Sequence, residues 1–165
     1  MDAPPALALL MATAMAACGA DDPDGPPFSE TADVRQLMAS VVEPAAEVYW
    51  DAVGWIVDAD GEEFVRPRTA EEWEAVRNAA VLLAEAGDLL IMETRAQGRE
   101  DWVAMSRAMT EVAVRALEAA RREDPLAVFD VGAEVYFTCT ACHGVYAVET
   151  LRPNVERDSA SSGRP

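Results

Sequence analysis

Residues 125–146 of this chain read PLAVFDVGAEVYFTCTACHGVY, a stretch that combines an apolar stripe with a reactive pentapeptide. The stripe consists of side chains that recur at steps of four and three: Val128, Gly132, Val135, Cys139 and Cys142. Such steps place side chains on one face of a helix. We therefore expect one helix over this stretch, with both cysteines on its inward face.

The pentapeptide Cys139-Thr140-Ala141-Cys142-His143 has the spacing of c-type haem attachment, in which two thiols bond the haem vinyl groups and the imidazole ligates iron. On a helix, residues at i, i+3 and i+4 point from one face toward one flat ring. The chain has 165 residues and 1 histidine, and that histidine stands at the ligand position. The sequence therefore predicts one haem c (iron) per chain, with cofactor ligands Cys139, Cys142 and His143.

Two other chemistries use similar residues. A zinc site needs about four ligands, usually Cys and His, whereas the chain has 3 Cys and 1 His, and Cys18 lies in a leader-like run. A thioredoxin-like thiol pair requires a strand–helix–strand context, and no strand pattern surrounds the pentapeptide. Haem attachment is the favoured interpretation, and a haem-free lipoprotein with a thiol pair is the alternative.

Four segments repeat the same apolar spacing, which is typical of helices packed nearly parallel to one another. They cover about residues 31–57, 70–93, 100–123 and 125–146. The first is expected to stay helical through Ala52 and Trp55 to Val57. The fold class predicted is all-α: an antiparallel up-down-up-down four-helix bundle with covalently attached haem near the end of the last helix.

Capping and helix-breaking residues support these segment boundaries. Residues 69–72 (TAEE) form a capping-box pattern, and Asp124-Pro125 supplies an N-cap followed by a first-turn proline. Gln97-Gly98 separates the second segment from the third. Pro44 lies inside the first segment and removes the backbone bond to the Ser40 carbonyl, so it should kink or split that helix. Residues 58–68 are expected to be the longest internal connection.

The N-terminal residues 1–17 resemble a signal peptide, although Asp2 stands where a basic residue is usual. The following Cys18 completes a pattern similar to a bacterial lipobox, so a lipid anchor is expected there, with ordinary cleavage as the alternative. Residues 18–30 are acidic and rich in Pro and Gly, which predicts a flexible tether. The bundle is expected over 31–150, and a disordered polar tail over 151–165.

The excess of acidic over basic residues limits the classes of molecule that the chain is expected to bind. The chain has 13 basic and 30 acidic residues, giving a net charge of −17. Such acidity disfavours nucleic acid and anionic membranes. It is compatible with docking to a basic redox protein and equally with simple solubility, which we favour. The membrane is expected to be a partner only through a lipid at Cys18, and the location periplasmic.

A Cys-x-x-Cys-His on the last helix of such a bundle resembles the class II c-type cytochromes, the cytochrome c prime superfamily. The likeness covers about residues 32–146, and Cys139, Cys142, His143 and Tyr146 match its terminal motif. The family often has Arg or Lys after that tyrosine, whereas this chain has Ala147. The resemblance implies the four-helix fold and allows a homodimer through the first two helices.

The resemblance also implies an iron ligand in the first segment. Residues 34–38 (VRQLM) are similar to the low-spin His/Met branch, in which a methionine here is the sixth ligand, so Met38 is expected to bind iron with His143. Arg35 is expected to pair with a haem propionate, and Tyr146 to contact the ring. Position along the helices admits Met105 as well as Met38, and an absent sixth ligand is the third option.

These observations predict an exported monohaem c-type cytochrome that carries single electrons and is not an enzyme. The sequence contains no Ser/His/Asp constellation, no phosphate-binding glycine loop and no spare histidine for hydrolysis. The alternative is five-coordinate iron that binds NO or CO.

Overall fold

The computed structural model describes residues 30–148. Its elements, in chain order, are α1 (Val34–Leu37), the π-helix η1 (Met38–Val42), α2 (Glu43–Asp51), β1 (Gly54–Asp58), β2 (Gly61–Val65), α3 (Ala70–Leu90), α4 (Glu93–Ala96), α5 (Glu100–Arg121) and α6 (Pro125–Tyr146). The prediction of a mostly helical chain is confirmed, although two strands interrupt the helices. The expected leader, the anchor at Cys18, the tether as far as residue 29 and the tail from residue 149 lie outside the described residues.

Side-chain caps fix the starts of two long helices. At α3, the Thr69 hydroxyl accepts from the Glu72 amide at 3.2 Å, and the Glu72 carboxylate accepts from the Thr69 amide at 3.0 Å, completing the predicted capping box. At α6, an Asp124 carboxylate oxygen accepts from the amides of Leu126 and Ala127, both at 3.1 Å. Both helices therefore begin where the sequence predicts.

The first helical segment is not split at Pro44, but it changes to a π-helix just before the proline, where the sequence predicts a kink or a split. A five-residue π-helix, Met38–Val42, precedes it, and the Glu43 amide donates to the carbonyl of Met38, five residues earlier. Proline cannot donate to the carbonyl four residues before it, so a wider turn accommodates the missing bond. Regular α-helix then resumes with Pro44 in the first turn of α2.

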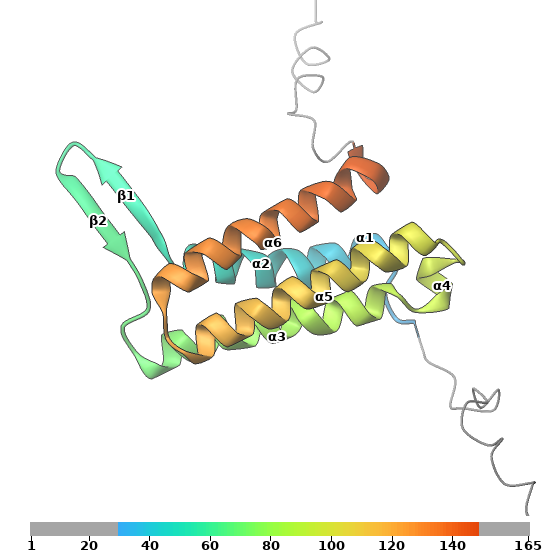
Figure 1. Cartoon of the computed structure of the whole chain (residues 1–165), viewed down its shortest axis with the longest axis horizontal. Coiled ribbons are helices and arrows are strands. Elements are labelled where there is room, and N and C mark those ends of the chain that lie inside the picture. Colours follow the sequence, from blue (N-terminus) through green and yellow to red (C-terminus); the bar gives the residue numbers. More distant parts are fainter. Residues whose placement is uncertain (1–29, 149–165) are drawn as a thin grey trace, which may run out of the picture. The chain divides into compact units, whose positions relative to one another are not determined.

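The prediction that helix continues to Val57 is wrong. The helix ends at Asp51, and Gly54–Asp58 forms a strand that pairs antiparallel with Gly61–Val65. Trp55, Ile56 and Val57 are aromatic or β-branched, a composition that favours strand, and the Asp58 side chain accepts from the Asp60 amide within the turn. The expected connection 58–68 is therefore largely the second half of a hairpin, which projects from the helices in Figure 1.

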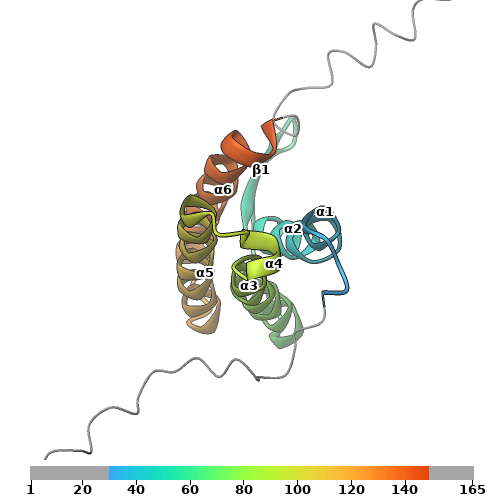
Figure 2. The ribbon, with the colours of Figure 1, turned by 90° about the vertical axis from the view of Figure 1, so that its right-hand side faces the viewer.

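The long helices pack through small residues. α3 packs along α5, α5 along α6, and α2 against α3, so that α3 lies between α5 and α2 in Figure 2. The contact surfaces of α3 and α5 are rich in buried alanine: Ala79, Ala80, Ala86, Ala113, Ala116, Ala119 and Ala120. Small side chains allow helix axes to approach closely, which explains the extended contact of this pair.

Close packing also accounts for the glycine of α6. A Cβ at Gly132 would lie 3.4 Å from Cδ1 of Trp50, and the Trp50 indole donates to the Gly132 carbonyl at 3.0 Å. At Gly132, α6 therefore approaches the first helical segment closely.

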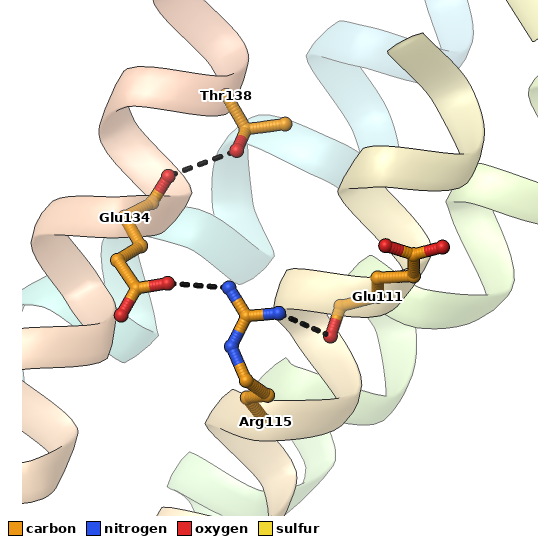
Figure 3. Close-up of polar contacts among 4 residues, drawn as sticks. All are labelled: Glu111, Arg115, Glu134 and Thr138. Atoms are coloured by element: carbon orange, nitrogen blue, oxygen red, sulfur yellow. Dashed lines mark hydrogen bonds and ion pairs between the residues drawn. The ribbon is translucent and has the colours of Figure 1, made fainter. Parts of the chain in front are cut away.

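One ion pair links α5 and α6. The Arg115 guanidinium contacts the Glu134 carboxylate, and one of its nitrogens also donates to the Glu111 carbonyl at 3.5 Å (Figure 3). Both side chains of the pair are about half exposed, at 49% and 51%. Solvent screens such a pair, so its contribution to stability is at most about 1 kcal/mol, and apolar burial holds the helices together.

Candidate functional site

The three residues of the predicted attachment motif lie in the last third of α6. We call Cys139, Cys142 and His143 the attachment face. All three are half-buried, and Cys139 packs against the apolar core. Both cysteines are free thiols. The structure therefore presents two thiols and an imidazole from adjacent turns of one continuous helix.

Burial raises the pKa of both thiols. For Cys139 the second cause is the nearby thiol of Cys142, while for Cys142 burial alone accounts for the change. The thiols are therefore protonated at neutral pH. A low thiol pKa would mark a redox-active cysteine pair, and neither thiol shows one.

The packing of α6 changes along its length. Its fully buried residues are Val128, Gly132 and Val135, all in the first half of the helix. In the second half the same stripe continues through Cys139, Cys142 and Tyr146, which are only half-buried. Figure 1 shows α6 diverging from α5 toward its C-terminal end. The inward stripe is thus apolar but incompletely covered at the attachment face, as a site for a large apolar ring requires.

An aromatic cluster ties the last turn of α6 to the start of α5. The rings of Trp102 and Tyr146 meet edge-to-face, with centroids 4.8 Å apart. The Arg99 guanidinium lies 4.6 Å from the Trp102 ring centroid and 5.2 Å from that of Tyr146. Cation–π distances of this size are favourable. Arg99 also donates to the carbonyls of Ala96 and Arg95, which fixes its position.

The Tyr146 hydroxyl faces a carboxylate. The nearby Asp101 carboxylate raises the pKa of Tyr146, although the buried Tyr146 hydroxyl makes no hydrogen bond of normal geometry. The same interaction, followed by the Trp102 amide, lowers the pKa of Asp101. Tyr146 is therefore held in position one turn beyond His143 by an aromatic edge and a cation, with a carboxylate beside its hydroxyl.

The two candidate methionine ligands have different surroundings. Met38 is half-buried, packs against the core and begins η1, at the end of the molecule where α6 terminates (Figure 1). Met105 lines a groove between α5 and α6 of about 270 Å³. Phe137 and Ala141, which share that groove, each lie roughly 160° around the helix from Cys139, while Thr138, at its edge, lies roughly 40° from Cys142. Met105 therefore borders a face of α6 other than the attachment face.

Two arginines lie near the start of the first helical segment. Arg35 is exposed on α1, in the described part of the chain. Arg95 is buried, at 7% exposure, and donates to the carbonyls of Leu89 at 2.7 Å and Ala32 at 3.0 Å. Arg95 thus joins the end of α3 to the residues before α1, at the end of the molecule where the attachment face lies.

Residues 30–148 contain neither a cluster of metal-binding side chains nor a helix that could span a membrane. No group of three or more His, Cys, Asp and Glu side chains in this range is placed to hold a metal ion. In the same range, no helix combines the length and apolar character needed to cross a membrane.

Comparison with protein-family models, with curated proteins and with solved structures returned no match for this chain.

The sequence did not indicate Arg99 or Asp101 as parts of the site. They lie more than 40 residues from Tyr146 in the chain. Nothing local marks them, because an arginine before a helix and an aspartate in its first turn are ordinary N-terminal features. The one indirect signal is the short link between α5 and α6, residues 122–124, which makes the two helices antiparallel and so brings the start of α5 beside the end of α6.

Proposed function

We propose that this chain is an exported monohaem c-type cytochrome of the low-spin class II type, with an up-down-up-down four-helix bundle formed by the α1–α2 segment, α3, α5 and α6. The observation that carries the proposal is the attachment face: two protonated, half-buried thiols and the chain's 1 histidine on adjacent turns of one helix. That face lies where the apolar stripe of α6 is incompletely covered. We propose haem c as its occupant.

The roles of the residues follow from their positions. Cys139 and Cys142 would hold the haem by thioether bonds, and His143 would ligate its iron through an imidazole nitrogen. The bound group would supply one-electron exchange between ferric and ferrous iron. Covalent attachment would hold the group in the bundle and prevent its loss in the periplasm.

The packing supports Met38 better than Met105 as the sixth ligand of the iron. It packs on the core at the same end of the helices as the last turn of α6, whereas Met105 borders the groove on another face. A thioether sulfur favours ferrous iron and raises the reduction potential. Two permanent ligands would also keep coordination unchanged between oxidation states, which suits an electron carrier rather than an enzyme.

Tyr146 and its neighbours would position the helix end that carries the ligands. Trp102 and Arg99 hold the tyrosine ring, and the Asp101 carboxylate lies close enough to its hydroxyl to raise the pKa of Tyr146. Arg35 is proposed as a partner of a haem propionate, because it is exposed on α1 at that end. Redox proteins are the proposed partners, and a lipid at Cys18 would confine the carrier to a membrane surface.

The decisive experiment expresses the full chain with a c-type haem maturation system and stains a denaturing gel for covalent haem. The expected result is stained wild type, and no stain for Cys139→Ala/Cys142→Ala. Absorption spectra of ferric and ferrous protein then give the spin state. Low-spin wild type that becomes high-spin in Met38→Ala, but not in the matched control Met105→Ala, supports the His143/Met38 pair.

Two outcomes contradict the proposal at different levels. Colourless matured protein with both thiols free would refute haem attachment altogether. Covalent haem with a high-spin wild-type spectrum would refute the electron-carrier function and favour a five-coordinate protein that binds NO or CO.

A further inference from the structure

The β1–β2 hairpin has one edge that lacks the usual protection against pairing. It is a two-stranded sheet, so each strand has a second edge that faces no strand of the described chain. β2 carries Glu62 and Glu63, charges that discourage another strand from pairing with it. β1 reads GWIVD, and its only charge is Asp58, at the turn.

The exposed side chains of β1 are large and apolar. Trp55 is 52% exposed, Ile56 51% and Val57 75%. Trp55 stacks on Phe64 with ring centroids 4.4 Å apart, and Phe64 packs against the core, so the base of the hairpin is anchored. An isolated two-stranded hairpin has marginal stability in water. An added strand would bury this apolar surface and satisfy the free backbone groups.

We propose that β1 pairs antiparallel with β1 of a second copy of this chain, forming a four-stranded sheet β2-β1-β1-β2 across a two-fold axis. The composition of β1 suits this partner. Although each chain has a net charge of −17, residues 54–57 carry no charge, so two copies of β1 can pair there without setting like charges opposite each other.

One register is self-complementary. Centred on Ile56, it places Ile56 opposite its symmetry mate, Trp55 opposite Val57, and Gly54 opposite Asp58. Aromatic and β-branched side chains are favourable cross-strand pairs, and this register sets no two acids opposite each other. The two β2 strands would lie three strand spacings apart, roughly 14 Å, which exceeds the Debye length of about 8 Å at physiological salt.

Other pairings of the same hairpin are less favourable. Pairing β2 with β2 about its centre sets Glu63 opposite Glu63. Pairing β1 with β2 of another copy leaves unpaired edges and would propagate into filaments instead of closing as a dimer.

The dimer does not depend on the proposed function. The hairpin leaves the helices at the end where α6 begins, while the attachment face lies near the end of α6, roughly 20–30 Å away by helical rise (Figure 1). Pairing through β1 would therefore leave both attachment faces accessible.

Sedimentation velocity of the full chain over a concentration series tests the proposal, with and without bound haem. We expect a monomer–dimer equilibrium in both forms. Ile56→Glu should raise the dimer dissociation constant by roughly tenfold or more, because two carboxylates would then face each other at the axis. An equimolar mixture of Ile56→Glu with Ile56→Lys should associate more tightly than either variant alone.

Val114→Glu is the matched control, because Val114 is a similarly exposed aliphatic residue, at 44%, on α5. It should leave the association unchanged. A wild-type chain that stays monomeric throughout overturns the proposal, and so does a dimer insensitive to Ile56→Glu. Failure of the mixed variants to associate would overturn the two-fold register. Helical circular dichroism checks that each variant is folded.

Discussion

At the residue scale, Tyr146 and Asp101 make a contact that should be visible in the pH dependence of stability. Their interaction lowers the pKa of Asp101 and raises that of Tyr146. A depressed carboxyl pKa contributes stability above the unfolded value of about 3.9, and that stability is lost as pH falls through the lower folded value. A raised tyrosine pKa contributes stability below about 10 that is lost as pH rises through the folded value.

Tyr146→Phe should therefore lower the free energy of unfolding at pH 7 and flatten its decline both below pH 4 and above pH 10. Urea unfolding across this range measures the effect. Asp101→Asn should flatten the acid limb in the same way, whereas Glu100→Gln removes a neighbouring charge without touching the hydroxyl and should keep the wild-type profile. Identical acid limbs for all four proteins would show that the interaction of Asp101 with Tyr146 contributes no stability.

Glycine at two helical positions gives a matched pair of predictions. A Cβ at Gly87 would lie 2.2 Å from the Thr110 hydroxyl and 3.0 Å from the Ser106 carbonyl oxygen, whereas nothing lies within 4 Å of one at Gly144. Gly87→Ala should destabilise by about 1–3 kcal/mol, because α3 and α5 must separate. Gly144→Ala should stabilise by up to about 1 kcal/mol through helix propensity. Thermal unfolding separates the two, and a neutral Gly87→Ala would contradict the close approach of these helices.

At the element scale, the start of α3 depends on its capping box. Thr69→Ala removes the hydroxyl that accepts from Glu72 and should cost about 1 kcal/mol of unfolding free energy. Thr69→Ser keeps an acceptor at the same place and should recover most of that loss. Chemical denaturation of the three proteins checks the comparison, and equal stability of the Ala and Ser variants would refute the role of the cap.

The elements that the sequence predicts well are those with local start and stop signals. Asp124-Pro125 and the capping box mark α6 and α3 unambiguously, because the side chains that satisfy the first amides are adjacent in the chain. The hairpin was missed because Ala52 and Trp55 continue a helical spacing while the Trp-Ile-Val run equally suits a strand. The spacing of apolar residues alone does not distinguish a helix from a strand in such short runs. Here Gly54 and the Asp58–Asp60 turn favour the strand.

At the scale of the whole molecule, the attachment motif could be recognised from sequence, but its surroundings could not. Cys139, Cys142 and His143 lie within five residues, so their shared face follows from helical geometry alone. The contacts of Tyr146 with Arg99 and Trp102 join segments that are distant in the chain and depend on how α5 and α6 pack. The separation of Met105 from the attachment face is likewise a property of the packed helices.

The packing also divides α6 into two halves with different expected dynamics. Its fully buried residues end at Val135, while α5 is buried from Trp102 to Ala120, along nearly its whole length. Helical segments with few buried contacts open locally at lower cost. In Cys139→Ser/Cys142→Ser protein, which cannot hold haem covalently, amides after Val135 in α6 should therefore exchange at least about tenfold faster than those before it, as measured by hydrogen–deuterium exchange.

The two ends of α5 provide the internal control and should be protected alike. Covalent haem in the wild type should slow exchange in the second half of α6 selectively, because the ring would cover the half-buried stripe. Uniform protection along α6 in the cysteine-free protein would show that the helix end needs no occupant, and would remove the physical reason for placing a ring there.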